Sequence, residues 1–216
     1  GSLVLNAGGV RYDISTNMSK FEGSLHINGS ARLMSNVTDM KKLTLTLGDG
    51  ASMRHYQGGS SNNVAAALHV GALADAAGYS SFKAKPTFGG SDESWFVGYN
   101  NADATFSGKL IAKSVTKVGT GNWTIKCNEN TSSITVKEGK LTIFNLSGSA
   151  TTGTLTIAKG ATLAGSGTTN SLVAQAGAII IPGLSETAVG TIKTNSNAII
   201  QAGASMIINV SATSNS

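Results

Sequence analysis

Apolar side chains alternate with small polar side chains over most of the chain. Clear examples are "SITVKEGKLTIF" (residues 133–144), "TLTIAKGATLAG" (154–165) and "AIIQAGASMIINV" (198–210). A period of two residues predicts half-buried β-strands rather than helices. In each example the alternation pauses at a glycine, so we expect short strands that are separated by tight corners.

The pattern returns along the chain in a loose repeat. Alternation is followed by two residues, a glycine and a small residue or lysine, and then alternation resumes; the corner glycines are Gly29, Gly50, Gly139, Gly160, Gly177 and Gly203. Two of the steps, from 29 to 50 and from 139 to 160, are 21 residues long. A period near 20 is typical of a solenoid, in which each turn buries its apolar stripe against a neighbour. These glycines are therefore expected at turns, with positive φ.

We predict an all-β fold, a right-handed parallel β-helix (solenoid) of about 8 to 10 turns. We expect residues 1–216 to form a single domain with a weak subdivision: residues 1–107, rich in polar and irregular stretches, form an irregular or capping part, and residues 108–216 form regular repeats. An antiparallel sandwich is the alternative, but no Asn-Gly or Asp-Gly hairpin signal recurs along the chain at the spacing of about 8 to 12 residues that a sandwich requires. The side chains expected to point inward are Ile134, Val136, Leu141, Ile143, Leu155, Ile157, Leu163, Leu172, Ile179, Ile181, Ile199 and Ile207.

Composition narrows the range of functions. Glycine contributes 27 of 216 residues, charged residues only 12%, and the net charge is +5. The basic residues are scattered, with only Lys41 and Lys42 adjacent, and no basic stripe is visible, so nucleic-acid binding is not expected. No apolar run approaches 18 residues, so no membrane-spanning helix is expected either.

Candidate catalytic chemistry is sparse. His26, His55 and His69 have no carboxylate or serine at an informative spacing, and structural or solvated roles are expected for all three, with His55 in a polar loop. Asp92 and Glu93 are adjacent, so in a strand they would face opposite sides. A glycosidase needs two facing carboxylates, and a calcium-dependent lyase needs an acidic cluster. We therefore expect no catalytic residue, no metal ligand, no cofactor and no enzymatic activity.

Four aromatic residues, Trp95, Phe96, Tyr99 and Phe106, fall within twelve positions. One interpretation is a cap that seals the end of the core. The other is a carbohydrate-binding platform, which requires an exposed, flat row made of Trp95, Tyr99 and Trp123.

Residues 95 to 210 also carry a resemblance. The succession "WFVGYNNADATFSGKL", "VTKVGTGNWTI", "SITVKEGKLTIF", "TLTIAKGATLAGSGTTNSLVAQAGAIIIPG" and "GTIKTNSNAIIQAGASMIINV" resembles the autotransporter-associated β-strand repeat family of bacterial surface proteins. The resemblance implies right-handed parallel β-helical passenger segments that Gram-negative bacteria export, and that serve in adhesion or as a stalk. The family has no shared catalytic residues.

The resulting expectation is a non-catalytic structural or adhesive module of a bacterial cell-surface or secreted protein. The alternatives are a carbohydrate-binding module that uses the aromatic cluster and a β-helix polysaccharide lyase or hydrolase. Expected partners are a host or cell-surface glycan or protein and neighbouring domains of a larger chain. Weak self-association is expected through the C-terminal end, because "SATSNS" (211–216) is too small and polar to cover a terminal turn.

Overall fold

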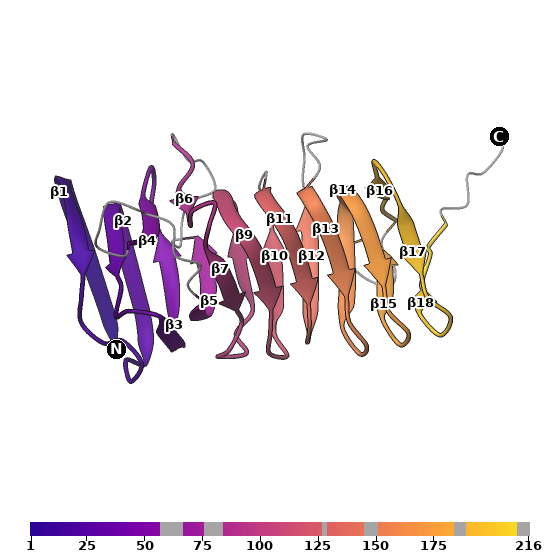
Figure 1. Cartoon of the computed structure of the whole chain (residues 1–216), viewed down its shortest axis with the longest axis horizontal. Helices are drawn as coiled ribbons and strands as arrows, with labels where there is room; N and C mark the ends of the chain where they lie inside the picture. The colour runs from indigo at the N-terminus through magenta and orange to yellow at the C-terminus, as the bar shows by residue number, and fades with distance from the viewer. Residues whose placement is uncertain (57–66, 76–83, 127–128, 145–150, 184–188, 211–216) are drawn as a thin grey trace.

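The chain forms a rod of stacked strands in a computed structural model, with its first and last strands at opposite ends (Figure 1). The structure describes residues 1–56, 67–75, 84–126, 129–144, 151–183 and 189–210. All of the named strands that pair with one another in these ranges are parallel, and they form a solenoid of about eight turns. The predicted all-β parallel solenoid is therefore confirmed. None of the described residues belongs to a helix that could cross a membrane.

Short strands dominate, as the glycine corners predict. In chain order the strands are β1 (Ser2–Ile14), β2 (Gly23–Met34), β3 (Asp39–Leu47), β4 (Ser52–Tyr56), β5 (Ala67–Asp75), β6 (Thr87–Phe88), β7 (Ser94–Val97), β8 (Ala104–Phe106), β9 (Lys109–Lys117), β10 (Asn122–Ile125), β11 (Glu129–Val136), β12 (Lys140–Phe144), β13 (Thr151–Ile157), β14 (Thr162–Ala174), β15 (Ile179–Pro182), β16 (Ile192–Thr194), β17 (Ala198–Ile200) and β18 (Ser205–Met206).

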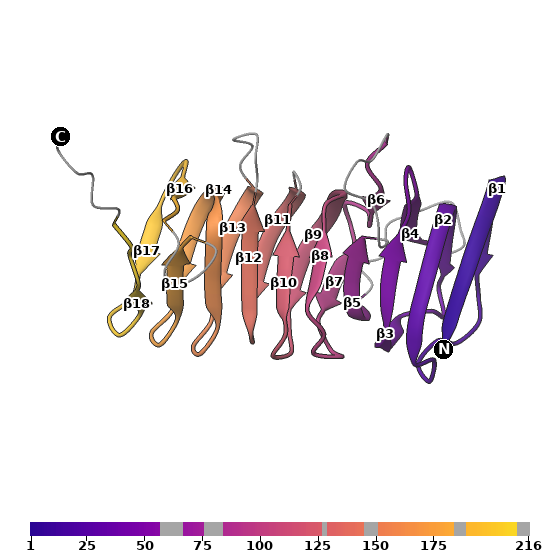
Figure 2. The same cartoon turned by 180° about the vertical axis from the view of Figure 1, so that it is seen from behind.

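The strand pairings define three ladders that run along the rod, and successive turns add segments to them (Figures 1 and 2). The first ladder contains the beginnings of β1 and β2, followed by β3 and the end of β5, and later β8, β10 and β12. The second contains the ends of β1 and β2, then β4, β6 and the beginning of β9. The third contains the beginning of β5, then β7, the end of β9, β11, β13 and β14. The long strands bend at corners and serve more than one ladder.

The core consists of rows of inward-facing side chains, in which an apolar side chain of one turn packs against an apolar side chain of the next turn. In the third ladder Ile134 pairs with Leu155, and Leu155 pairs with Leu172. All three side chains are at most 3% exposed. Because fully burying one such side chain contributes about 1.5–3 kcal/mol, the stack gains stability with every turn that is added.

Nine of the twelve predicted core residues are buried, and three are not. Leu163 pairs with Ile180, and this pairing places Ile180 in the inward row. Ile179, one residue earlier, is therefore half-buried. Ile199 is 52% exposed because it pairs with Val173 in an outward row. Ile207 is half-buried near the C-terminal end of the described chain.

The corner prediction is confirmed. All six predicted corner glycines have positive φ, from 63° at Gly50 to 104° at Gly29. Gly139 shows why glycine is required: its φ is 66°, and an added Cβ would lie 2.4 Å from the carbonyl oxygen of Gly119 on the preceding turn. The turns approach too closely at this corner for a side chain to fit.

The N-terminal section belongs to the stack but is less regular than the remainder. Register shifts occur in β1 between Asn6 and Arg11, and in β3 between Met40 and Thr44. In the first ladder, β5 and β8 contact each other without ladder pairing in the described residues. The indole Nε1 of Trp123 donates a hydrogen bond across this break to the carbonyl oxygen of Leu73, at 3.0 Å.

A buried lysine stabilises one corner. Lys117 lies in an inward row between Val97 and Val136 and is 1% exposed. Its Nζ donates hydrogen bonds to the carbonyl oxygens of Val118, Gly119 and Glu138, at 2.7, 2.8 and 3.3 Å. Burial lowers the pKa of Lys117 to about 8. The side chain therefore joins two successive turns through backbone carbonyl groups.

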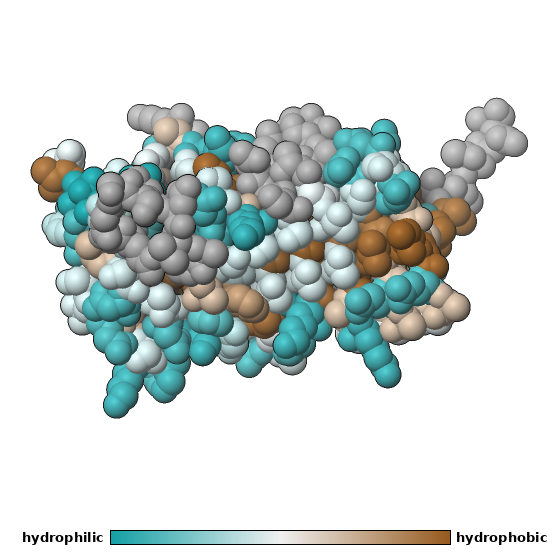
Figure 3. Space-filling view, viewed as in Figure 1, coloured by the Kyte–Doolittle hydropathy of each residue, from teal (hydrophilic) through white to brown (hydrophobic). Residues whose placement is uncertain are grey.

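The C-terminal turn exposes apolar side chains. Ile199, Ile200 and Met206 are 52%, 41% and 46% exposed. Ile200 occupies the same inward row as the buried Ala174 but has no further turn on it in the described chain. The result is a brown, apolar surface near the C-terminal end of the rod (Figure 3). The segment 211–216, which was expected to leave this end uncovered, lies outside the described residues.

Replacing Leu155 by Asp tests the inward register. The change places an unpaired charge between Ile134 and Leu172, and we expect the free energy of unfolding to fall by about 3–5 kcal/mol. Thr156→Asp, at the next position on the outer face, is the matched control and should cost less than about 1 kcal/mol. Chemical denaturation of both variants makes the comparison, and equal losses would contradict the register.

Replacing Lys117 by Met tests the corner clamp. Methionine keeps the length of the side chain but leaves three carbonyl oxygens without their ammonium donor, so we expect a loss of about 1–3 kcal/mol in the free energy of unfolding. Lys113→Met, at an exposed position of the same strand, should change it by less than about 0.5 kcal/mol. Urea unfolding gives both values, and an unchanged or more stable Lys117→Met protein would show that the clamp contributes nothing.

Candidate functional site

A line of basic and hydroxyl side chains crosses the second ladder in the N-terminal half of the rod. Arg11 pairs with Ser30, Ser30 with Ser52, Ser52 with Thr87, and Thr87 with Lys109. These residues come from five strands and lie up to 98 positions apart in sequence. Because neighbouring strands are about 4.8 Å apart, the line is roughly 19 Å long. All five side chains belong to the outward row of the ladder, where they are half-buried or exposed.

The surface along this line is hollowed. A hollow of about 410 Å³ is lined by Arg11, Ser30, Ala31, Ser52, Met53, Arg54, Thr87 and Gly89. A second hollow of about 300 Å³ is lined by Lys85, Thr87, Gly108 and Lys109. The two hollows lie on either side of Thr87, which lines both. We call the surface made by Arg11, Ser30, Ser52, Arg54, Lys85, Thr87 and Lys109 the basic groove.

One end of the basic groove carries an arginine pair that shares a single carboxylate. Arg32 donates to both carboxylate oxygens of Asp13, at 3.0 and 2.5 Å, and Arg11 Nε donates to Asp13 Oδ1 at 3.1 Å. The hydrogen bond from Arg32 lowers the pKa of Asp13. Two guanidinium groups face one carboxylate, so this end keeps a positive charge. The Arg32 guanidinium also covers the ring of Tyr56, 3.7 Å from its centroid.

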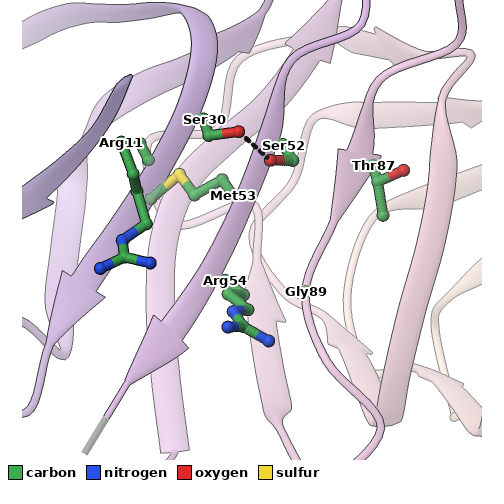
Figure 4. Close-up of a pocket in the computed structure, with 8 residues that line it drawn as sticks. Arg11, Ser30, Ser52, Met53, Arg54, Thr87 and Gly89 are labelled. Atoms are coloured by element: carbon green, nitrogen blue, oxygen red, sulfur yellow. Dashed lines mark hydrogen bonds between the residues drawn. The ribbon is translucent and has the colours of Figure 1, made fainter. Parts of the chain in front are cut away.

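Arg54, the third arginine of the chain, interacts with the buried carboxylate of Glu93 through its charge alone. It is exposed on β4, directly beside Arg32 in the register, and among the described residues its side chain makes no hydrogen bond or ion pair. Next to it, Ser52 Oγ donates a hydrogen bond to Ser30 Oγ at 3.0 Å, which fixes the two hydroxyls along the line. Figure 4 shows this serine pair bridging β2 and β4, with Arg11 on one side, Thr87 on the other, and Arg54 further along the strand that carries Ser52.

A buried carboxylate forms the support behind Arg54. Glu93 is 7% exposed; its Oε1 accepts a hydrogen bond from the backbone N–H of His55, and its Oε2 accepts one from Trp95 Nε1, both at 2.8 Å. Burial raises the pKa of Glu93, and these two hydrogen bonds oppose that rise. Glu93 joins β4 to the turn that leads into β7, so it holds in place the strand that carries Arg54.

The arrangement can bind anions along a line. Guanidinium groups match carboxylate, sulfate and phosphate oxygens in a bidentate manner, and the serine and threonine hydroxyls can donate or accept hydrogen bonds. The positive groups are spread along the groove and do not converge on one point. The chemistry therefore suits an extended ligand with repeated anionic groups better than a single small anion. Among the described residues, no three His, Cys, Asp or Glu side chains gather in a way that could hold a metal ion.

The tryptophans expected in an exposed aromatic row are core residues. Trp95 is 0% exposed and Trp123 is 2% exposed, and both indole N–H groups are used inside the rod. Tyr99 is half-buried, and its hydroxyl lies 3.0 Å from His69 Nδ1. The three residues therefore do not form a sugar-stacking platform. Trp95 packs on Phe88, with ring centroids 4.3 Å apart, in the middle of the stack, so the cluster does not cap an end either.

The histidines have structural surroundings. His26 contacts Thr46 and Asn28 at 2.8 Å, and the ring of His69 stacks on Phe96 at 4.9 Å. Burial lowers the pKa of His69. His55 was expected in a polar loop, but it lies in β4 and is 9% exposed, because Met53 and His55 both face inward there.

Sequence reasoning missed the basic groove. The three arginines of the chain stand at positions 11, 32 and 54, about one turn apart, and this spacing was the available signal. The hydroxyl residues between them resemble the many other Ser and Thr residues of the chain. Neither protein-family models nor curated proteins give a match to this sequence.

Glu93 provides a test by pH. The native pKa of Glu93 lies above the usual 4.5. Between these two values the native protein keeps a proton on Glu93 that the unfolded chain has lost. The contribution of Glu93 to the free energy of unfolding therefore falls as the pH rises from 4.5 through the native pKa. We therefore expect the free energy of unfolding of the native protein, minus that of Glu93→Gln, to be higher at pH 5 than at pH 7. Glu22→Gln is the exposed control; Lys42 lowers the pKa of Glu22, so its pH trend has the opposite sign. A Glu93 difference that grows with pH would contradict the assignment.

Proposed function

We propose that the chain is a non-catalytic structural or adhesive module of a bacterial cell-surface or secreted protein, and that the basic groove is its adhesive surface. The observation that carries the proposal is the line from Arg11 to Lys109, in which the ladder register fixes basic and hydroxyl groups on an elongated scaffold. A rigid scaffold of this kind holds binding groups at set positions, so a ligand loses little free energy in ordering them.

The sequence resemblance supports the same proposal from the other half of the chain. Residues 95 to 210 resemble autotransporter-associated β-strand repeats, and that resemblance favours export by a Gram-negative bacterium and a position outside the cell. The basic groove lies mostly in residues 11–87, before the resembling part begins. In this proposal the repeats act as the stalk, the N-terminal section makes contact, and neighbouring domains of a larger chain continue the assembly.

Adhesion can be measured with coated beads. Beads that carry the chain are incubated with cultured epithelial cells, and the beads retained after washing are counted. We expect retention to fall at least fivefold when Arg11→Gln and Arg54→Gln are combined, while the charge-matched control Lys137→Gln/Lys159→Gln retains most of the binding. Both control lysines are exposed and lie away from the groove. Equal retention of the two double variants would overturn the proposed adhesive surface.

The competing proposal is a β-helix polysaccharide lyase or hydrolase. The same protein is incubated with acidic and neutral polysaccharides, and the products are followed by reducing-end and unsaturated-uronate assays. Our proposal expects no turnover. Turnover that is lost when a single Asp, Glu or Lys is replaced would contradict the non-catalytic assignment.

Weak self-association through the C-terminal turn is part of the proposal, with a second copy of the chain as the partner. The side chains of Ile200 and Met206 are partly exposed there. Inside the rod, the apolar side chains of each turn pack against those of the next turn, and a second copy of the chain can offer the same kind of contact. We expect the sedimentation coefficient to rise with protein concentration, and Ile200→Glu to abolish the rise. Val10→Glu, at the opposite end and 67% exposed in the native chain, is the control. A strict monomer at all concentrations would contradict this contact.

A further inference from the structure

The basic groove has the features needed to select one class of polymer, and this inference rests on the proposed adhesive function. We propose that the groove binds a linear acidic polysaccharide, one that carries sulfate or carboxylate groups, with its chain lying along the rod axis across β1, β2, β4, β6 and β9. The anionic groups lie on Arg11, Arg54 and the lysines, and the sugar hydroxyls lie on Ser30, Ser52 and Thr87.

The first argument is the linear order of the groups. Along the row a guanidinium is followed by three hydroxyls and then by an ammonium, one side chain per turn. Each step is about 4.8 Å, so the row offers a new hydrogen-bonding group at roughly the interval of a single monosaccharide. A polymer of acidic sugars presents the complementary set, with hydroxyls on every unit and anionic groups at intervals.

The second argument is the charge balance of the groove. Arg54, Lys85 and Lys109 make no ion pair among the described residues, and Arg11 shares Asp13 with Arg32. Glu93, the carboxylate behind Arg54, is buried and points toward His55 and Trp95. The groove surface is therefore cationic, and a neutral polysaccharide would leave its charged groups without partners.

The third argument separates polysaccharide from nucleic acid. Proteins that bind single strands combine basic groups with aromatic faces on which bases stack. Tyr56, on the strand that carries Ser52 and Arg54, is covered by the Arg32 guanidinium. Phe88, from the strand that also carries Thr87, is 0% exposed. The residues that line the two hollows in the described part of the chain thus supply hydroxyl and basic groups, and none of them is aromatic.

Calorimetric titration tests the inference with the whole chain and five probes: heparin oligosaccharides of increasing length, polygalacturonate, dextran sulfate, neutral dextran and the oligonucleotide dT20. We expect the heparin fragments to bind more tightly with length until they span the row, and neutral dextran not to bind. Binding of heparin without polygalacturonate assigns the site to sulfate, and the reverse assigns it to carboxylate; either result supports an acidic polysaccharide. Binding of dextran sulfate that matches heparin would show that the sulfate groups and not the uronates are recognised, which also supports it.

The variants separate the groove from general surface charge. Arg54→Gln/Lys109→Gln should weaken heparin binding at least tenfold because it removes two positive charges from the groove, and neither side chain donates a hydrogen bond to another described residue. Lys137→Gln/Lys159→Gln removes the same charge elsewhere and should change the affinity less than twofold. Circular dichroism and melting of each variant establish that it is folded. Equal weakening by both double variants would overturn the proposal, as would tighter binding of dT20 than of a heparin fragment of equal charge.

The outcomes also separate this inference from the proposed function. Beads that adhere through the groove while no acidic polysaccharide binds would overturn the ligand class and leave adhesion in place. Acidic polysaccharide that binds at the groove while the beads do not adhere would support the ligand class and overturn the adhesive function.

Discussion

Parallel stacking of one turn on the next, about 4.8 Å apart, is the constraint on which the rest of this structure depends. Every outward or inward position is repeated on the next turn, so side chains of the same kind collect in rows. Inside the rod this produces rows such as Ile134, Leu155 and Leu172, in which each apolar side chain covers the next. Small residues and glycine are abundant because closely spaced turns leave little room at the corners, as the contact between Gly139 and Gly119 shows.

The same constraint creates the candidate site. Arg11, Ser52 and Lys109 are far apart in sequence, and only the register of the second ladder brings them into one line. Glu93 acts behind that line by accepting hydrogen bonds from both β4 and Trp95. The structure thereby combines an apolar interior, which supplies stability, with an outer surface that can vary without disturbing the stack. A binding surface of this kind needs no loop closure, because the strands themselves position its groups.

The sequence predicted the class of fold because its period-two alternation and its glycine spacing are direct consequences of stacking. The residues of each strand that face inward were harder to predict. In the run from Ile179 to Ile181 all three residues are apolar, so alternation cannot show which one faces inward, and pairing with Leu163 decides it. The sequence left the place of the two tryptophans open because a large ring fits either a core or a platform; in the structure Trp123 pairs with the small residue Ala104 and donates to the carbonyl oxygen of Leu73 inside the rod. The basic groove depends on pairing between distant turns of unequal length, and a pattern within one turn cannot reveal it.

The register of the second ladder is therefore the central claim, and a disulfide measures it directly. With the natural cysteine replaced by Cys127→Ser, Ser30→Cys and Ser52→Cys are combined, the protein is oxidised, and the linked peptides are identified by mass spectrometry. Cysteines at paired positions about 4.8 Å apart fall within the range that a disulfide can bridge, so the account predicts rapid and nearly complete formation of the 30–52 bond. A protein with Ser30→Cys and Arg54→Cys, shifted by two residues along the strand, should form the bond slowly or not at all. Preferential linkage of positions 30 and 54 would contradict the register and the groove that is built on it.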